Sequence, residues 1–364
     1  MPKLQTFDVV FDNEYAVYHA GQIVAGHVLL VLNEAKKFDK ILIEFKGKAK
    51  TSWTKWRGQT SNHYSGEEYY FEDQNELDVP NMADGKLNAG EHRLNFAYQL
   101  PEKLPSSFEG PYGYIRYTVT ITMQRSWAAD ISEKRAFSVV AKEDLNNFPE
   151  LRNPETIEDE EDITCCCCSR GKIHVTISIP KKGYVAGEEI VISYNIKNIS
   201  TQTTGALKFR LKQHVLYKGL SFWGNEHDKM ESDLVCEVVA MEGMRPGEEL
   251  DIPNLPIPIP ALPPSLADCN LIDICYNIKV DFEGVGMQHY FPIRIGTVPL
   301  RDTAPSAPPP PYDLSAPPPP HVDLPPPRYE ECVTRGQSCM EDDDLKYTAG
   351  DLIFVPRYAY YSRE

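Results

Sequence analysis

Two long parts of the chain share one pattern, a strict alternation of apolar and polar residues. Apolar residues occupy every second place at positions 115–124, 173–179 and 272–282. Side chains on a strand point alternately to opposite faces, so this period is typical of half-buried strands in antiparallel sheets. No comparable stretch keeps a helical period. We therefore predict an all-β chain with two tandem immunoglobulin-like β-sandwiches, at residues 1–150 and 172–298.

Charge separates these two blocks from the rest of the chain. The 364 residues include 37 Lys and Arg against 53 Asp and Glu, a net charge of -16. Residues 143–162 carry -8 of it and residues 299–364 carry -5, so the predicted sandwiches are close to neutral. A general nucleic-acid binder needs a basic surface that releases counterions, and this composition excludes that class. We interpret residues 151–171 as an acidic, cysteine-rich linker between the sandwiches.

Proline distinguishes the last part of the chain. Of the 30 prolines, 13 lie between Pro305 and Pro356, where aliphatic residues are few. Such a segment buries too little apolar area to offset the entropy that it loses on ordering. We predict a disordered, proline-rich tail over residues 299–364 with polyproline II character.

Two Pro-Pro-x-Tyr (PPxY) motifs lie in this tail. A polyproline II ligand is extended before it binds, and the tyrosine adds a buried ring that fixes direction and register. WW domains recognise this pattern, and tandem WW domains would gain avidity from two copies. The alternative is a spacer in which tyrosine follows proline by chance. The predicted WW-domain-binding residues are Pro309, Pro310, Tyr312, Pro326, Pro327 and Tyr329.

Four of the nine cysteines are consecutive: Cys165, Cys166, Cys167 and Cys168. A structural zinc site needs a second pair of ligands, and no C-x2-C or H-x3-H segment supplies one, so we predict no metal and no cofactor. Two interpretations stay open. The cluster is a site of S-acylation (palmitoylation) that holds the protein on a membrane, or a strand whose cysteines pack as small apolar residues. Thiol-based redox regulation is a third alternative.

Motifs of catalysis, secretion and membrane insertion are missing from the sequence. It contains no H-E-x-x-H, G-x-S-x-G, P-loop or strand-linked G-x-G-x-x-G, so we assign no catalytic residues and expect no enzyme activity. The N-terminus lacks the apolar core of a secretory signal, and the most apolar run, 23–32, is too short to cross a bilayer. We expect a cytoplasmic protein with mostly reduced cysteines.

A basic stripe follows one predicted strand of the first block. It is interpreted as a solvated strand face, or as a contact surface for acidic cargo tails or anionic lipid. Its members are Lys46, Lys48, Lys50, Lys55 and Arg57.

A short signature occurs once in each block. Tyr18-His19-Ala20-Gly21 is similar to Tyr184-Val185-Ala186-Gly187, and an alternating segment follows each of them. The match indicates one turn used twice, as expected for a duplicated sandwich.

Longer strings resemble a known family. Residues 106–117 read Ser-Ser-Phe-Glu-Gly-Pro-Tyr-Gly-Tyr-Ile-Arg-Tyr, and residues 257–265 read Ile-Pro-Ile-Pro-Ala-Leu-Pro-Pro-Ser. Together with the cysteine run and the two PPxY motifs, they resemble the α-arrestins (arrestin-domain-containing proteins) over the whole length of the chain. The resemblance implies the arrestin fold and a non-enzymatic adaptor role.

The resemblance also implies partners and a location. Nedd4-type HECT ubiquitin ligases would bind the motifs through their WW domains, and cytoplasmic regions of membrane receptors or transporters would be the cargo. The adaptor would promote cargo ubiquitination, endocytosis and sorting while peripherally associated with the plasma membrane and endosomes. A sorting scaffold that acts without ubiquitin is the alternative. A thioredoxin-binding cysteine has no counterpart in residues 248–258, and the sequence shows no clear counterpart of the buried charge cluster of visual and β-arrestins.

Overall fold

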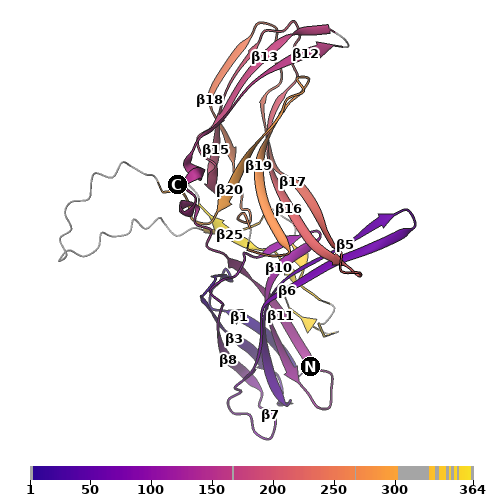
Figure 1. Ribbon diagram of the computed structural model, residues 1–364. Helices are drawn as coiled ribbons and strands as arrows, with labels where there is room; N and C mark the ends of the chain where they lie inside the picture. Colours follow the sequence, from indigo (N-terminus) through magenta and orange to yellow (C-terminus); the bar gives the residue numbers. More distant parts are fainter. Residues whose placement is uncertain are drawn as a thin grey trace, which may run out of the picture.

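The chain folds into two β-sandwiches that follow one another along the long axis of the molecule (Figure 1). The described residues contain no α-helix, and two short 3-10 helices, η1 (Leu145–Asn147) and η2 (Pro149–Arg152), connect the sandwiches. The predicted all-β architecture of two tandem sandwiches is therefore confirmed. This computed structural model describes residues 3–165, 168–266, 268–301, 328–332, 336–341, 344–345, 348–350 and 352–361.

The N-terminal sandwich packs a three-stranded sheet against a larger one. The smaller sheet has the order β1-β3-β8, with β1 (Leu4–Phe11), β3 (Ile23–Leu32) and β8 (Gly90–Gln99). The larger one has the order β6-β5-β10-β11-β2, with β6 (Thr60–Leu77), β5 (Lys40–Arg57), β10 (Gly113–Gln124), β11 (Ile131–Val140) and β2 (Val17–His19). The short strand β9 (Phe108–Gly110) pairs with β10, and β4 (Lys36–Lys37) and β7 (Lys86–Leu87) form a separate two-stranded sheet.

The C-terminal sandwich also has two sheets. One has the order β12-β13-β15-β18, with β12 (Glu155–Cys165), β13 (Cys168–Ile179), β15 (Glu189–Asn198) and β18 (Glu249–Pro258). The other has the order β14-β20-β19-β16-β17, with β14 (Gly183–Val185), β20 (Gln288–Gly296), β19 (Ile272–Phe282), β16 (Leu207–Ser221) and β17 (Glu226–Met241).

One sheet continues through both sandwiches. The end of β16 pairs with β6 at Leu220↔Ser65 and Ser221↔Tyr64, which joins the larger sheets into a single path. Beside this joint the Thr51 hydroxyl donates to the carbonyl of Lys218 at 2.7 Å. Backbone pairing therefore fixes how the two sandwiches lie relative to each other, which the sequence did not predict.

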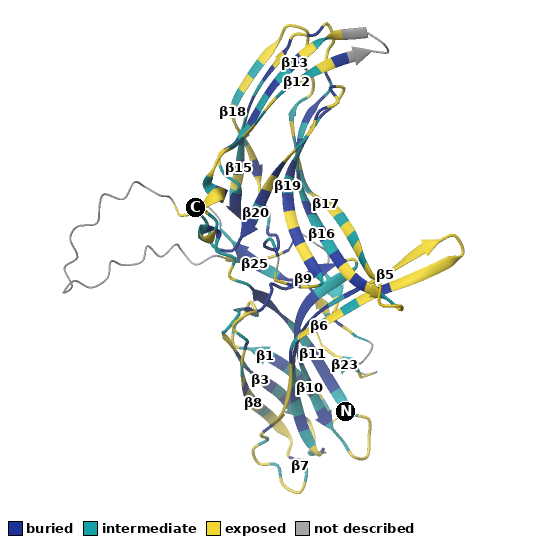
Figure 2. Cartoon of the chain, viewed as in Figure 1, coloured by how far each residue is buried: buried dark blue, intermediate teal, exposed yellow. Residues whose placement is uncertain are grey.

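Burial follows the predicted alternation along most strands (Figure 2). Strand β10 departs from it: Ile115, Tyr117 and Val119 are fully buried, but Arg116 and Thr118 on the opposite face are buried too. A strand buried on both faces must be covered on its outer side. The cover is a distant part of the chain, described below.

The duplicated turn predicted from the sequence is confirmed by geometry. Gly21 and Gly187 both have positive φ, +79° and +92°, where a Cβ would be strained. The short strands just before them, β2 and β14, each pair in parallel with the last long strand of their own sandwich, β11 and β20.

The duplication extends to a second segment of each sandwich. Ser107 donates its backbone N–H to the carbonyl of Val139 and accepts that residue's N–H at its Oγ, at 2.9 Å. Ser265 does the same with Ile295, at 3.0 Å for the Oγ contact. The two family-like strings therefore perform one structural task, which is to hold the last long strand of each sandwich.

Residues 151–171 are not a linker, contrary to our prediction. Residues 155–165 form β12, the edge strand of the C-terminal sandwich, paired with β13 in antiparallel register from Glu155↔Ile179 onward. Acidic side chains occupy both faces of β12 around Ile157 and Ile163, and charges on an exposed edge discourage pairing with another chain. The charge run that suggested a linker is thus typical of a protected edge.

The tail is only in part what the proline content predicted. Residues 302–327 lie outside the described residues, but segments beyond them form strands that pack on the N-terminal sandwich, yellow in Figure 1. We call the described residues from 328 to 361 the C-terminal strap. Disorder over all of residues 299–364 was therefore a wrong prediction for these segments. The strap strands are β21 (Arg328–Glu331), β22 (Gln337–Ser338), β23 (Thr348–Ala349), β24 (Ile353–Phe354) and β25 (Arg357–Tyr360).

Candidate functional site

One residue of the predicted WW-binding motifs can be placed in the fold. Tyr329, the tyrosine of the second motif, lies in β21 of the strap. The other predicted motif residues, Pro309, Pro310, Tyr312, Pro326 and Pro327, lie outside the described residues.

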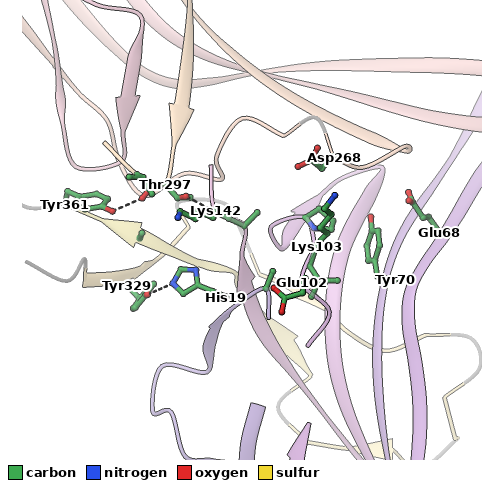
Figure 3. Close-up of a pocket in the computed structure, with 16 residues that line it drawn as sticks. His19, Glu68, Tyr70, Glu102, Lys103, Lys142, Asp268, Thr297, Tyr329 and Tyr361 are labelled. Atoms are coloured by element: carbon green, nitrogen blue, oxygen red, sulfur yellow. Dashed lines mark hydrogen bonds between the residues drawn. The ribbon is translucent and has the colours of Figure 1, made fainter. Parts of the chain in front are cut away.

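The side chain of Tyr329 is half-buried against the N-terminal sandwich (Figure 3). Its hydroxyl lies 3.1 Å from Nε2 of His19, and its ring is tilted against the rings of His19 and Tyr15, with centroids 6.5 and 6.4 Å away. His19 Nδ1 lies 3.0 Å from the carbonyl of Val140, so Nδ1 donates and, in the neutral ring, Nε2 accepts the phenol proton. Burial raises the pKa of Tyr329, which keeps the hydroxyl protonated.

Strand pairing holds the backbone around Tyr329. Strand β21 is antiparallel to β25, with Tyr329 opposite Ala359. In β25, the buried Tyr358 donates its hydroxyl proton to the carbonyl of Ser107 at 2.7 Å, and the N–H of Arg357 donates to Ser138 Oγ at 2.9 Å. The strap is thus bonded to β11 and to the segment just before β9 in the N-terminal sandwich.

The end of the strap also contacts the C-terminal sandwich. Tyr361 donates its N–H to the carbonyl of Ala186 at 3.0 Å and its hydroxyl proton to the carbonyl of Thr297 at 2.7 Å (Figure 3). A Cβ added to Gly187 would lie 2.3 Å from the carbonyl oxygen of Tyr361, so the strap passes directly over the repeated turn. A cavity of about 920 Å³ lies at this junction, lined among others by His19, Tyr329 and Tyr361.

A second part of the strap carries acids onto buried lysines. The Glu341 carboxylate lies 2.7 Å from Nζ of Lys48 and accepts the Tyr114 hydroxyl at 2.6 Å, and Asp344 lies 2.9 Å from Nζ of Lys134. The side chains of both lysines are less than 5% exposed. These acids and lysines, with Tyr114, form the strap charge cluster.

Ionisation within this cluster follows the pairing. Burial alone would raise the pKa of Glu341, but Lys134, Lys48 and Tyr114 outweigh it and the pKa is lowered. Burial would lower the pKa of Lys48, but Glu341 and Glu67 outweigh it and the pKa is raised. Both groups are therefore charged at neutral pH, and each needs the other in a buried setting.

A separate buried pair lies beside the cluster. Arg116 and Glu109 form a bidentate contact with both distances 2.7 Å. Burial raises the pKa of Glu109 to about 7, against the opposing effect of the Arg116 hydrogen bonds. Buried charged groups therefore do occur in this chain, although the sequence showed no clear counterpart of the buried charge cluster of visual and β-arrestins.

Comparison with known proteins decides the family. The model of the arrestin (or S-antigen) N-terminal domain matches residues 7–146, and that of the arrestin C-terminal domain matches residues 169–300. Arrestin domain-containing protein 17 of Caenorhabditis elegans is 37% identical over 310 residues, covering 82% of this chain and 72% of that protein. The chain belongs to the α-arrestin family.

More distant α-arrestins cover similar or larger parts of the chain. Arrestin domain-containing protein 4 of Homo sapiens is 28% identical over 82% of this chain and 72% of that protein. Arrestin domain-containing protein 1 of Mus musculus is 28% identical over 92% of this chain and 74% of that protein. Arrestin-family proteins are non-enzymatic adaptors, so this α-arrestin has an adaptor role in trafficking that involves binding to other proteins.

The basic stripe of the α-arrestin divides into two parts. Lys46 and Lys48 are buried, so a solvated strand face is wrong for them, whereas Lys55 and Arg57 are exposed at the end of β5. The sequence did not identify Lys134, which does not belong to the basic stripe. It also did not identify the acids of the strap, Glu341 and Asp344. The one signal for those acids was the acidic run 341–344 near the chain end, which was attributed to a disordered tail.

Exposed aromatic side chains lie on two neighbouring hairpins. Trp56 is 71% exposed near the tip of the β5–β6 hairpin, and Phe222 and Trp223 are 91% and 83% exposed in the β16–β17 turn. Lys55 Nζ lies 3.3 Å from Nε2 of His227, which links the two hairpins. Large exposed aromatic groups of this kind mark surfaces that contact another molecule.

Cys165 and Cys168 pair with each other in the β12–β13 hairpin, at the far end of the C-terminal sandwich from the strap (Figure 1). Cys165 ends β12 and Cys168 begins β13, while Cys166 and Cys167 lie outside the described residues. Within the described part of the chain, no cluster of His, Cys, Asp and Glu fits a metal ion, and no helix is long and apolar enough to span a membrane.

Proposed function

We propose that this α-arrestin recruits Nedd4-type HECT ubiquitin ligases to membrane cargo through its two PPxY motifs. The ligase would bind through its WW domains, and cargo ubiquitination, endocytosis and sorting would follow from proximity. Pro309, Pro310 and Tyr312 carry one contact, and Pro326, Pro327 and Tyr329 carry the other.

The observation that carries this proposal is the presence of two complete PPxY motifs in one adaptor chain, with their tyrosines 17 positions apart. Two copies suit a ligase with several WW domains, because the second contact is intramolecular and raises avidity. The two sandwiches supply the surface for the cytoplasmic part of a receptor or transporter. The exposed aromatic residues Trp56, Phe222 and Trp223, beside the basic Lys55 and Arg57, are the best candidates for that surface.

We further propose that Cys165, Cys166, Cys167 and Cys168 are S-acylated and hold the protein at the plasma membrane and endosomes. The four cysteines are consecutive, and two or more acyl chains anchor a protein stably where one does not. Residues at the same end of the sandwich suit a membrane surface, since Ile199 is 52% exposed and Arg170 beside it is basic and exposed.

The redox alternative from the sequence concerns Cys165, Cys166, Cys167 and Cys168. At other positions of the chain it is disfavoured, because burial raises the pKa of the thiols of Cys236, Cys269, Cys275 and Cys339 and so opposes the thiolate that redox exchange requires. A sorting scaffold that acts without ubiquitin assigns no binding partner to the two PPxY motifs.

The test compares the wild-type chain with the Tyr312→Ala/Tyr329→Ala double variant in ligase pull-down and cargo ubiquitination assays. We expect the double variant to lose ligase binding and to leave cargo unmodified. Tyr290→Ala, an exposed tyrosine in β20, serves as the matched control. Undiminished ligase binding by the double variant refutes the proposal, whereas sorting that persists without ligase binding supports the scaffold alternative.

Acylation is tested separately by replacing the four consecutive cysteines with serine. We expect the variant to lose hydroxylamine-sensitive lipid labelling and to move from the membrane to the soluble fraction. Cys275→Ser, at an exposed position of β19, is the matched control. Labelling that persists in the fourfold variant contradicts this site.

A further inference from the structure

The second PPxY tyrosine cannot occupy two environments at once. A WW domain recognises the motif by burying the tyrosine ring and contacting its hydroxyl. In this structure the Tyr329 ring packs against Tyr15 and His19, and its hydroxyl is hydrogen-bonded to His19 at 3.1 Å. The ring and hydroxyl of Tyr329, which a WW domain would contact, are therefore already occupied by Tyr15 and His19 of the same chain.

The backbone of the motif's last two residues is also in the wrong form for a WW domain. Arg328 and Tyr329 belong to an antiparallel ladder in which they lie opposite Tyr360 and Ala359. The polyproline II helix that a WW groove accepts has no such ladder. Binding of a WW domain therefore requires β21 to separate from β25 as well as Tyr329 to leave His19.

The strap resists this separation through anchors on both sides of β21. Tyr358 in β25 is fully enclosed and bonded to Ser107, and Cys332 directly after β21 is buried. Glu341 adds its contact with Lys48 in the strap charge cluster. Since β21 shares its ladder with β25, freeing the motif loosens part of a unit that is docked at several points.

We propose that the surface formed by His19 and Tyr15 is an intramolecular binding site for Tyr329, and that it withholds the second PPxY motif from WW domains. The site accepts a tyrosine side chain carried on an extended strand. The inference rests on the proposed function, because it concerns how the same motif is regulated. Access to the second motif is then set by the equilibrium between the docked and released strap.

The expected size of the effect follows from that equilibrium. The apparent affinity of a ligand falls by the fraction of molecules in the competent state. A strap that is docked in nine of ten molecules weakens binding about tenfold, which corresponds to about 1.4 kcal/mol. We expect at least this factor.

The experiment measures binding of one recombinant WW domain from a Nedd4-type ligase to the full chain, by fluorescence anisotropy. The Tyr312→Ala chain retains only the second motif, and a peptide of residues 322–333 gives the affinity of that motif without the strap. His19→Ala is added to the Tyr312→Ala chain to open the site, with His27→Ala on β3 as the matched control. Glu341→Gln loosens the strap at a point remote from Tyr329 in sequence, should His19→Ala disturb the fold.

We expect the Tyr312→Ala chain to bind at least tenfold more weakly than the peptide. His19→Ala or Glu341→Gln should recover at least fivefold, and His27→Ala should change nothing. Equal affinity of the Tyr312→Ala chain and the peptide, within about threefold, overturns the inference and leaves the proposed function intact. Weak binding that neither releasing variant improves also overturns it. If the peptide itself fails to bind the WW domain, the proposed function fails for this motif, and the inference falls with it.

Discussion

Replacing Glu341 with Gln removes one charge from the strap charge cluster and leaves its shape unchanged. The carboxylate lies 2.7 Å from Lys48 Nζ, 3.8 Å from Lys134 Nζ and 2.6 Å from the Tyr114 hydroxyl. The amide keeps an acceptor for Tyr114 but loses the attraction to the lysines. Both lysines are covered by the strap, so they regain water if the strap leaves.

The magnitude follows from what each lysine retains. Breaking a buried ion pair costs about 3–5 kcal/mol, and a hydrogen bond to a charged group contributes about 1.5–3 kcal/mol. Lys48 keeps Glu67 at 2.9 Å and Lys134 keeps Asp344 at 2.9 Å, so neither is left without a countercharge. We therefore expect a loss of about 2–3 kcal/mol in the docking free energy of the strap, a factor of roughly 30–150 in its opening equilibrium.

Tryptic cleavage after Arg357 measures this opening. The Arg357 N–H is bonded to Ser138 and the next residue, Tyr358, is buried, so the bond is cut only when the strap has opened. When closing is faster than cutting, the rate follows the open population. We expect Glu341→Gln to speed the cut roughly 30–150-fold, or up to the rate of a free peptide of the same sequence if that limit comes first.

The control and the refuting outcome are both direct. Glu330→Gln changes an exposed acid of β21 and should leave the rate within about twofold. The thermal midpoint of the sandwiches should stay nearly constant, because the released lysines are hydrated. An unchanged cleavage rate combined with a lower midpoint refutes the reasoning, since Glu341 would then stabilise the sandwich and not the docking of the strap.

Three further predictions concern stability. Burial and the neighbouring Asp8 raise the pKa of Glu133 from 4.5 to about 8. Between these pH values the folded state holds a proton that the unfolded state has released, so the free energy of unfolding falls as the pH rises. Glu133→Gln should therefore match wild type near pH 4.5 and gain about 1–2 kcal/mol above pH 8 in urea titrations, after allowance for solvent screening. Gly187→Ala, at φ +92° and with its Cβ against Tyr361, should cost about 1–3 kcal/mol and expose the last strap residues to hydrogen exchange. Tyr276→Phe removes the 2.7 Å hydrogen bond that the Tyr276 hydroxyl donates to the carbonyl of Pro263 and should cost about 1–2 kcal/mol in urea titrations, and an unchanged midpoint would refute a stabilising role for this bond.

The sequence predicted the features that depend on local pattern. Alternation identified the sandwich strands, and the similarity of the segments ending in Gly21 and Gly187 identified the duplicated turn. These succeeded because pleat period and turn conformation are decided within a few residues.

What the sequence did not predict depends on distant contacts or on averaged composition. The lysine at position 134 meets Asp344 across 210 residues, and nothing in either neighbourhood indicates the pairing. Arg116 was assigned to a polar strand face, yet Glu109 and the covering strap bury it. Averaging composition over residues 299–364 combined a proline-rich stretch with a strap that contains Phe354 and Tyr358, and so concealed the apolar anchors.

A docked second motif gives the two PPxY motifs different tasks. When a partner with a single WW domain binds at Tyr329, its binding free energy is reduced by the whole docking free energy of the strap, and no second contact offsets that loss. A partner with tandem WW domains that has bound at Tyr312 meets the second motif at an effective concentration on the order of millimolar, and avidity gains of about 10²–10⁴ exceed a tenfold masking. By linkage, binding at Tyr329 then weakens strap docking by the same factor by which docking weakens binding. Because the strap also holds Ala186 and Thr297 through Tyr361, such a partner would loosen the contact between the sandwiches as well. Under the proposed function, masking of one motif therefore favours multivalent ligases and couples their binding to the junction between the two domains.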